Sequence, residues 1–400
     1  MTLTYSTNIV IFGGGIAGLW LLNRMQNEGY RPILFETEAL GGRQTLSSQG
    51  IIHGGLKYAL SGSLNNAAQA IASMPSRWRQ CLNGNGEVDL TGVKLLNEHY
   101  YMWSHGGLRS KLKSYLGSKS LRGKVTSLPK DSYPEFFSKS SVNGTLYHLA
   151  DFVLDTESLL RKLVSKSPER IFSLKNCKYN FSSDENASKQ RLEVIIGNKK
   201  IVIDAELFIF CAGEGNTELI SKASLSSIKS QTRPLHMVYL RSPDLPRIHV
   251  HCIGNSFNLN PSLTVTSHEA ENGDIIWYLG GDIAESGIKR SKGEQIKTAE
   301  KLIMKTFPWF QISGANWKSF FINRSEADVQ NNYRPDDAVV KSEENILVAW
   351  PTKLTLVPSL ADKVLTKMAE SGMAPQGKDD SLNELQSVFN RPSLAKAYWD

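Results

Sequence analysis

The first thirty-five residues change from one hydrophobic periodicity to another. A short β-rich run at residues 8–12 (NIVIF) is followed by apolar residues at helical spacing over 16–25. Gly29 ends that predicted helix, and a second β-rich run starts at residue 33. A strand, a glycine turn, a helix and a strand in this order predict the opening of a parallel sheet with right-handed crossovers.

Later segments predict further elements of both kinds. Three segments each have apolar residues on one face of a helix, and we expect helices at 155–165, 294–307 and 359–371. Shorter amphipathic stretches are found at 65–74 and 78–82. A hairpin across Gly197 and Asn198 is expected from its β-rich flanks, and the other parallel strands are expected at 207–212 and 345–349. Four runs alternate apolar and polar residues, which predicts an antiparallel sheet with one solvated face: 237–240, 247–252, 262–267 and 274–280.

This order of elements predicts an α/β fold with two interleaved domains. One is a Rossmann-like domain with helices on both faces of a parallel sheet, and the other is a substrate domain on a mainly antiparallel sheet. We expect the first from residues 1–60, 150–222 and 330–372 and the second from 61–149 and 223–329. Residues 373–400 are expected to form a C-terminal tail.

The charge pattern favours a small anionic partner over nucleic acid. The chain has 46 Lys and Arg against 39 Asp and Glu, a net charge of +7. Its basic residues are scattered, apart from residues 109–124, which we interpret as a solvated face. Nucleic-acid binding is therefore not expected.

Cysteine spacing and the lengths of the apolar runs indicate the cellular compartment in which the protein is expected. The four cysteines lie far apart and form no C-x-x-C pair, so neither a metal site nor a disulfide framework is expected, and a reducing cytoplasm fits best. No apolar run reaches the roughly 18 residues needed to cross a bilayer, so no transmembrane segment is expected. Peripheral membrane contact is left open.

The glycine turn has the spacing of a dinucleotide site. Gly13, Gly15 and Gly18 form G-x-G-x-x-G around Ile16 and Ala17. This spacing permits a tight turn, close approach of the backbone to a pyrophosphate and close packing of helix on strand. Glu36, at the end of the second strand, is expected to accept hydrogen bonds from ribose hydroxyls. These features alone do not separate FAD from NAD.

The segment after this unit separates the two cofactors. Residues 41–60 read GGRQTLSSQGIIHGGLKYAL, and with the glycine turn and Glu36 they resemble the D-amino-acid oxidase, glycine oxidase and glycerol-3-phosphate dehydrogenase superfamily of FAD-dependent oxidoreductases. Residues 154–159 are similar to the helix start by which these enzymes re-enter the FAD domain, and 204–213 resemble their strand that ends in Ala-Gly. Residues 333–363 resemble their closing element, with Lys353 where the family has glycine.

The resemblance implies FAD as the cofactor and a set of residues that contact it. Beyond the glycine turn and Glu36, the implied contacts are Arg43, Gln44, Ser48, Gln49, Gly50, Gly213, Lys353, Leu354 and Thr355. It also implies hydride transfer from a CH–OH or CH–NH carbon of a small anionic substrate, such as a 2-hydroxy acid, an amino acid or a phosphorylated polyol. No metal is expected, and oxygen, a quinone or a protein could each accept the electrons.

Four residues are candidates for the substrate pocket. Arg334, in the Arg-Pro pair of the closing element, is expected to bind the substrate anion. His53 is the candidate general base, since an unperturbed pKa of about 6.5 suits proton abstraction at neutral pH, but a histidine that packs in its loop is an equal alternative. Lys57 and Tyr58 are expected to add a charge and a hydroxyl to the same pocket. Trp277 and Tyr278 are expected in the core.

Two other interpretations stay open at this point. Glu36 followed by Gly41-Gly42-Arg43 also resembles the flavin amine oxidases and carotenoid desaturases, although the spacing is one residue short and their C-terminal Gly-Glu motif is absent. The second alternative is a non-catalytic flavoprotein that binds nucleic acid or a protein partner, for which the basic balance is the only support.

Overall fold

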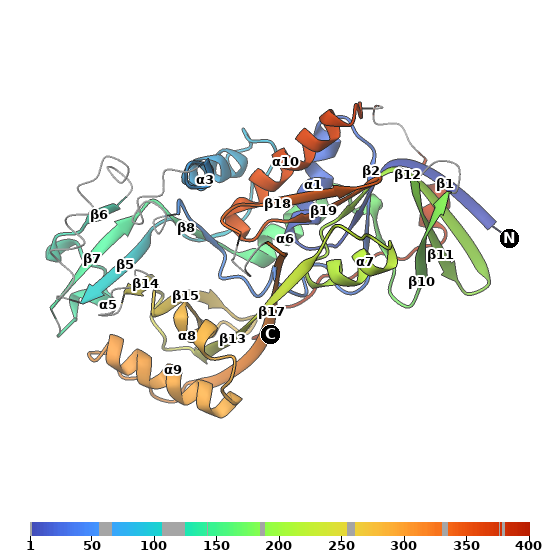
Figure 1. Ribbon diagram of the computed structural model, residues 1–400. Helices are drawn as coiled ribbons and strands as arrows, with labels where there is room; N and C mark the ends of the chain where they lie inside the picture. Colours follow the sequence, from blue (N-terminus) through green and yellow to red (C-terminus); the bar gives the residue numbers. More distant parts are fainter. Residues whose placement is uncertain are drawn as a thin grey trace.

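The computed structural model describes residues 2–55, 66–105, 125–141, 143–184, 189–253, 261–329, 335–375, 377 and 381–400. Two eight-stranded sheets and a three-stranded sheet form its framework, with helices packed on the outside (Figure 1). This mixed α/β architecture confirms the predicted fold class. None of the described helices is long and apolar enough to cross a membrane.

The first sheet has five parallel strands, which reach one of its edges at β9, and three antiparallel strands. Its parallel strands, in spatial order, are β9 (Ile171–Ser173), β2 (Pro32–Glu36), β1 (Thr2–Phe12), β12 (Lys199–Phe210) and β19 (Ile346–Trp350). The antiparallel strands are β10 (Lys178–Asp184), β11 (Lys189–Ile196) and β18 (Val339–Glu343).

Both faces of this sheet are covered, as its nearly continuous apolar strands require. One face packs on α1 (Ile16–Asn27), α3 (Asn66–Leu82), α6 (Thr156–Ser165) and α10 (Val357–Glu370). The other face packs on strands β10 and β11 together with the short helices α7 (Asn216–Lys222) and α11 (Asn383–Gln386). Asp155 caps α6 by accepting a hydrogen bond from the Ser158 amide, as its sequence position predicts.

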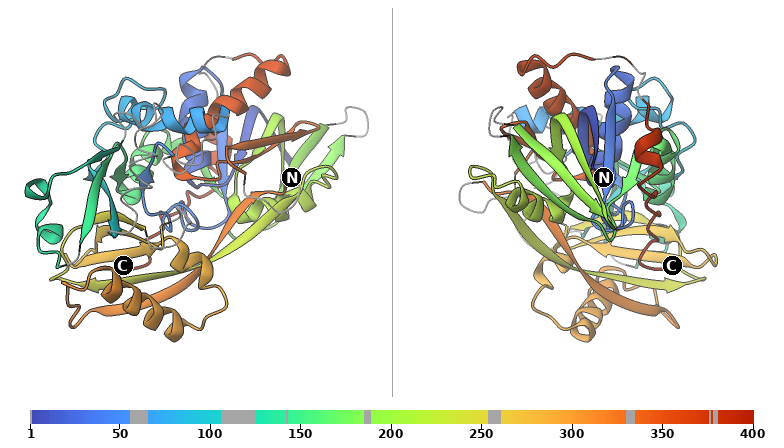
Figure 2. Two further views of the ribbon diagram at one scale, coloured as in Figure 1. Left: turned by 60° about the vertical axis from the view of Figure 1, so that its left-hand side comes forward. Right: turned by 90° about the vertical axis from the view of Figure 1, so that its right-hand side faces the viewer.

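The second sheet has the strand order β17-β13-β16-β15-β14-β5-β7-β6, and among these described strands only β14 and β5 pair in parallel. The strands are β17 (Asn316–Ala327), β13 (Ser230–Ser242), β16 (Ile275–Gly280), β15 (Leu263–Glu269), β14 (His249–Ile253), β5 (Tyr100–His105), β7 (Gly144–Leu149) and β6 (Val125–Ser127). Helix α9 (Lys292–Thr306) runs across the face of this sheet that points away from the first sheet (Figure 2). The third sheet contains β3 (Ile51–Ile52), β8 (Phe152–Leu154) and β4 (Leu95–Asn97).

Three sequence predictions are wrong in detail. The predicted strand 207–212 is the second half of β12, which pairs with β11 over its first half and with β19 over its second. The two stretches 65–74 and 78–82 form one helix, α3, which continues through Pro75. The second sheet has no solvated face along β16, whose residues are all buried, because α9 covers one side and the chain's last residues cover part of the other.

Those last residues form a strap across both large sheets. We call residues 390–400 the C-terminal strap. The Leu40 amide donates to the Ser393 carbonyl oxygen at 2.8 Å, and the Ala395 amide donates to the Leu40 carbonyl oxygen at 3.0 Å. At the other end, the Tyr398 ring stacks on Phe320 with centroids 3.9 Å apart. The predicted tail is thus ordered against the protein over this stretch.

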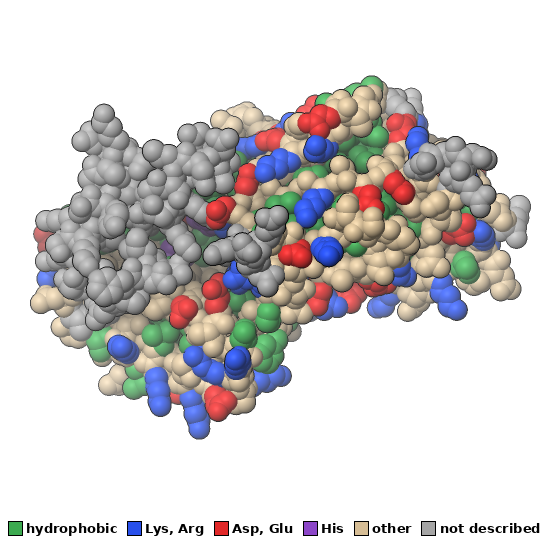
Figure 3. All heavy atoms as spheres, viewed as in Figure 1, with side chains coloured by type: hydrophobic (Ala, Val, Ile, Leu, Met, Phe, Trp, Pro, Cys, Tyr) green, Lys and Arg blue, Asp and Glu red, His purple; other side chains and the backbone are tan. Residues whose placement is uncertain are grey.

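Charges on the face shown in Figure 3 are interspersed. Over the described part of that face, Lys and Arg side chains alternate with Asp and Glu side chains. The basic stretch 109–124 lies outside the described residues.

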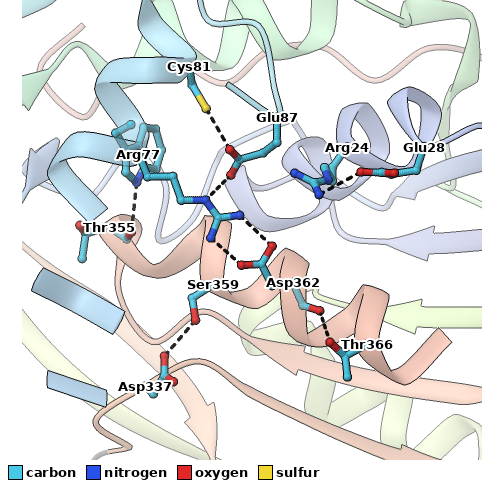
Figure 4. A network of polar contacts seen from close by, with 11 residues as sticks. Arg24, Glu28, Arg77, Cys81, Glu87, Asp337, Thr355, Ser359, Asp362 and Thr366 are labelled. Carbon is cyan, nitrogen blue, oxygen red and sulfur yellow. Dashed lines mark hydrogen bonds and ion pairs between the residues drawn. The ribbon is translucent and has the colours of Figure 1, made fainter. Parts of the chain in front are cut away.

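An arginine links α3 to α10. Arg77 donates to both carboxylate oxygens of Asp362, at 2.5 and 2.7 Å, and its Nε donates to Glu87 at 2.7 Å (Figure 4). The Glu87 side chain is only 11% exposed, so its charge depends on this partner. Trp78 adds a hydrogen bond from its indole nitrogen to the Thr355 carbonyl oxygen.

Replacing Arg77 by alanine is expected to lower the free energy of unfolding by about 2–3 kcal/mol, because it leaves the Glu87 carboxylate buried without its cation. Urea denaturation measures this change. The control is Arg161→Ala, which removes an ion pair whose arginine is 62% exposed, and a change below about 0.5 kcal/mol is expected there. Equal effects of the two substitutions would contradict the prediction.

Candidate active site

One cavity of about 1120 Å³ passes between the two large sheets. It begins at the glycine turn after β1 and extends along residues 36–53 to β13, β16 and β17. Of the predicted cofactor residues, Gly18 and Thr355 do not line it, whereas these do: Gly13, Gly15, Ile16, Ala17, Glu36, Arg43, Gln44, Ser48, Gln49, Gly50, Gly213, Lys353 and Leu354.

Each glycine of the turn is required for a different structural reason. Gly13 has a φ of +108°, and a Cβ there would lie 2.5 Å from the Ala212 Cα. A Cβ on Gly18 would lie 1.9 Å from the Gly13 carbonyl oxygen, so Gly18 permits close packing of α1 without lining the cavity. Among the described residues, a Cβ on Gly15 would meet only the Thr45 hydroxyl, at 3.2 Å. Gly15 therefore leaves space for a ligand at the start of α1.

Thr45 is a cavity residue that the sequence did not suggest. Its hydroxyl accepts a hydrogen bond from the Ile16 amide at 3.0 Å and so fixes the loop to the first turn of α1. Gly15, the N-cap residue of α1, has no side chain to cap the helix. The positive end of α1 consequently faces the cavity wall, as an anion site requires.

Glu36 is held at the end of β2 by two backbone amides. Its carboxylate accepts hydrogen bonds from the Gly14 amide at 2.6 Å and from the Glu38 amide at 2.8 Å. Two carboxylate oxygens offer about four acceptor positions, so Glu36 could accept further bonds from ribose hydroxyls.

Arg43 lines the cavity and forms an ion pair with Glu38. Its guanidinium donates to both oxygens of Glu38, at 2.6 and 3.0 Å, and its side chain is 60% exposed. The hydrogen bond to Glu38, followed by the charges of Glu38 and Glu214, raises the pKa of Arg43. Gln44, the next residue, instead faces the second sheet and accepts a hydrogen bond from the Ser325 amide at 3.1 Å.

Residues 47–50 run between the two sheets. Gln49 donates to the Tyr278 carbonyl oxygen at 3.0 Å, and a Cβ on Gly280 would lie 2.3 Å from its side-chain oxygen. The Tyr278 hydroxyl donates to the Ser47 carbonyl oxygen at 2.8 Å. Trp277 and Tyr278 are fully buried and do not line the cavity, in agreement with their expected core position.

His53 stands at the far end of this run, in a turn that is held from two sides. The Thr355 hydroxyl accepts from the His53 amide at 3.3 Å and lies 3.2 Å from the His53 carbonyl oxygen, to which it donates. The Gly54 amide donates to Asp151 at 2.9 Å, and burial raises the pKa of the Asp151 carboxyl to about 6. Thr355 is therefore a brace behind the turn.

The His53 ring also has a defined hydrogen-bond arrangement. The Gly55 amide donates to Nδ1 of His53 at 3.2 Å, so in neutral histidine the proton is on Nε2. His53 lines the cavity at this point. The other substrate-pocket candidates, Lys57, Tyr58 and Arg334, lie outside the described residues.

The second sheet supplies a wall whose individual residues the sequence did not identify. Leu235 and Met237 of β13, together with Ile322 and Arg324 of β17, line the cavity opposite the cofactor loop. Their alternation along each strand was the available signal, but β17 has no motif that distinguishes it from a surface strand.

These features fit a bound FAD. The cavity is larger than the roughly 300–1,000 Å³ typical of a single small-molecule site, and its lining runs from the glycine turn to the His53 turn. The open Gly15 position and the uncapped start of α1 suit a pyrophosphate. The buried Ser48 hydroxyl, which has no hydrogen-bond partner among the described residues, adds an unused polar group beside it.

Comparisons with known proteins agree with this geometry. No protein-family model matches the chain. The chain is 38% identical over 404 residues to a Pseudomonas aeruginosa protein named a probable FAD-dependent oxidoreductase, PA4991, with 99% of this chain and 98% of that protein aligned. The crystal structure of PA4991 superposes with a TM-score of 0.83 and 34% identity, covering 100% of this chain and 99% of that one.

More distant structures share the fold. Glycine oxidase from Geobacillus kaustophilus has a TM-score of 0.65 at 15% identity, with 97% and 99% of the two chains covered. The L-α-glycerophosphate oxidase from Mycoplasma pneumoniae, which has FAD bound, has a TM-score of 0.64 at 12% identity, with 91% and 95% covered. The prediction of an FAD-dependent oxidoreductase with FAD as its cofactor is thus confirmed, and the distant structures show that the fold is shared with a glycine oxidase and a glycerophosphate oxidase. This chain belongs to the FAD-dependent oxidoreductases, and FAD is its cofactor.

Proposed function

We propose that this enzyme oxidises a small anionic substrate at a carbon that carries a hydroxyl or an amino group. The observation that carries the proposal is the continuity of the cavity, which joins the glycine turn to the His53 turn and to the apolar residues of β13 and β17. A substrate there would lie between the flavin loop and the second sheet. Neighbours of this fold include a glycine oxidase, a glycerophosphate oxidase, an iminodiacetate oxidase and a proline dehydrogenase, which act on small acids or phosphates.

The proposed cofactor domain is discontinuous. Strands of the first sheet all come from residues 1–60, 150–222 and 330–372, which supports assigning these segments to the FAD domain. The second sheet takes all its strands from 61–149 and 223–329, which supports a substrate domain. Residues 373–400 then form a tail that joins the two.

The bound flavin supplies the hydride acceptor, and residues of this chain supply orientation. Thr355 and the Asp151–Gly54 hydrogen bond brace the His53 turn, which lines the cavity. An imidazole at this point can donate a hydrogen bond to the substrate or accept a proton from it. If His53 served as the base, Nε2 would have to accept the substrate proton. The ring proton would then first have to move to Nδ1, which would break the hydrogen bond that Nδ1 accepts from the Gly55 amide.

Anaerobic mixing of the purified enzyme with candidate substrates tests the proposed function. Loss of the oxidised flavin absorption with a 2-hydroxy acid, an amino acid or a phosphorylated polyol would support it and would identify the class. Flavin absorption that no such compound changes would reject it. Repeating the reaction with oxygen or a quinone then identifies the electron acceptor.

His53→Ala is expected to lower kcat by roughly 10²-fold, which is typical for loss of a positioned acid–base or hydrogen-bonding group. The pH profile of kcat separates the two roles. A donor role predicts that the variant retains the profile of the unaltered enzyme, whereas a base role predicts that one limb of the profile disappears. Unchanged kcat would remove His53 from the reaction.

Arg334→Ala is expected to raise KM by roughly 10- to 100-fold while FAD remains bound, because a bidentate guanidinium–anion contact contributes about 1.5–3 kcal/mol. Arg334→Lys is the matched variant and should recover part of the loss through its charge alone. Steady-state kinetics with the identified substrate measures both. A normal KM in Arg334→Ala would exclude this arginine as the anchor.

A further inference from the structure

The described wall of the cavity carries more acidic than basic side chains. Its acids are Glu36, Glu38, Glu214, Glu218 and Glu285, and its bases are Arg43, Lys222, Arg324 and Lys353. FAD brings a dianionic pyrophosphate into this space. Buried anions need a paired charge or several donors, so a cation of the wall that can turn toward the pyrophosphate would stabilise the complex.

Three of the four cations are poorly placed for this. Arg43 forms its two-pronged ion pair with Glu38 at the solvent edge. Lys222 lies 4.0 Å from the centre of the Tyr179 ring and 3.3 Å from Glu218. Lys353 is in a solvent-exposed hydrogen bond with the Asp336 carbonyl oxygen.

Arg324 is less exposed to solvent than Lys222 and Arg43. Its side chain is 16% exposed, against 27% for Lys222 and 60% for Arg43. A charge interaction is strengthened where water is excluded, so Arg324 gains most from an incoming anion. Its Nη2 contacts Glu285 Oε1 at 3.2 Å, and Glu285 is itself 46% exposed.

The position of Arg324 along β17 is level with the glycine turn. Its neighbour Ser325 donates to Gln44 Oε1, and a Cβ on Gly213 would lie 3.1 Å from the same oxygen. Ala212, directly before Gly213, is the residue that a Cβ on Gly13 would strike. A short series of contacts thus connects β17 at Ser325 to the turn that receives the pyrophosphate.

The part of the cavity beside Gln49, where we place the flavin ring, lies further along the same strand. Gln49 rests on Gly280, and the β13 residue next to that position, Met237, pairs with Phe320 of β17. Arg324 lies four residues beyond Phe320, which corresponds to about 13 Å along a strand. This offset separates Arg324 from the end where the substrate would react.

We propose that Arg324 is the counter-ion of the FAD pyrophosphate and that its contact with Glu285 holds the guanidinium in the cavity wall. A guanidinium presents several N–H donors in one plane, so it can bind a phosphate oxygen pair without leaving the wall. The assignment concerns cofactor binding alone and does not depend on which substrate the enzyme oxidises.

Titration of the apoprotein with FAD, followed by flavin fluorescence, tests the proposal. Arg324→Ala is expected to raise the Kd for FAD by roughly 10- to 100-fold, as for loss of a charge-assisted hydrogen-bond pair. Arg247→Ala is the matched control, since it removes an equal charge from the same domain but outside the cavity, where Arg247 is 50% exposed in an ion pair with Glu269, and a change of less than about threefold is expected. Glu285→Gln, which removes the competing carboxylate, is expected to leave the Kd unchanged or lower it.

Riboflavin provides the second arm, because it carries the same ring without phosphates. The Kd for riboflavin should be equal in Arg324→Ala and the unaltered protein, within about twofold. If the two ligands weaken together, the substitution acts through the fold, and the proposal is overturned. A normal Kd for FAD with a raised substrate KM would also overturn it and would assign Arg324 to the substrate. If the alanine variant does not fold, Arg324→Gln takes its place, because it removes the charge but keeps a long polar side chain, and the same outcomes support or overturn the proposal.

Discussion

Gly13→Ala protein is expected to purify without FAD and to unfold at a lower urea concentration than the unaltered chain. A methyl group at position 13 would lie 2.5 Å from the Ala212 Cα and 2.7 Å from the Cys211 carbonyl oxygen, both backbone atoms that cannot rotate away. The turn must therefore move relative to β12. Because its amide also donates to the Phe35 carbonyl oxygen, that movement disturbs β2 and the Glu36 carboxylate at its end.

The backbone conformation adds a second cost that can be measured separately. Gly13 has a φ of +108°, whereas Gly273, in a tight turn far from the cavity, has a φ of +87° and would place a Cβ in open space, with no described atom within 4 Å. Gly273→Ala therefore reports the left-handed strain alone, about 1–2 kcal/mol. The ratio of bound flavin to protein absorption gives the cofactor content of both variants. Gly13→Ala protein that retains full flavin content would contradict the assigned role of this turn.

Local sequence determined the parts of the site that could be predicted. The glycine turn and the two strands that flank it are stabilised by contacts between residues close in the chain. The spacing of the glycines therefore predicts this unit. The hairpin across Gly197 and Asn198 is local for the same reason, and it forms as expected between β11 and β12. Register within these units follows from the turn residues alone.

Parts of the site that depend on distant partners were not predictable. Arg43 has the spacing of a phosphate ligand and lines the cavity, but its ion pair with Glu38 is not visible in the motif. Arg324 lies on β17, which pairs with β13, a strand distant in the chain. The burial of Arg324 depends on this pairing, so the local sequence does not predict it. Long-range pairing also explains why β12 is one strand, since its two halves serve different neighbours.

The C-terminal strap illustrates the same limit and carries the last prediction. Its composition is that of an ordinary tail, but Leu40, to which it is hydrogen-bonded, packs directly behind the glycine turn: a Cβ on Gly14 would lie 2.2 Å from Leu40 Cδ2. The other end of the strap buries Trp399 to 8% exposure against Tyr278 and His268. Tyr278 in turn donates to Ser47 in the cofactor loop. Both ends of the strap therefore support the loop that lines the FAD cavity.

Truncation after Phe389 is expected to lower the free energy of unfolding by about 3 kcal/mol or more, since loss of a buried tryptophan alone has an effect of this size. It should also speed FAD release, because the loop 40–49 loses its support at Leu40 and at Tyr278. Thermal unfolding and the rate of flavin fluorescence recovery on dilution measure the two effects. The control is Lys396→Ala, which removes only a 68% exposed ion pair with Glu271 and should change neither quantity. If the truncated protein is destabilised but releases FAD at the normal rate, the strap joins the two sheets without supporting the cofactor loop.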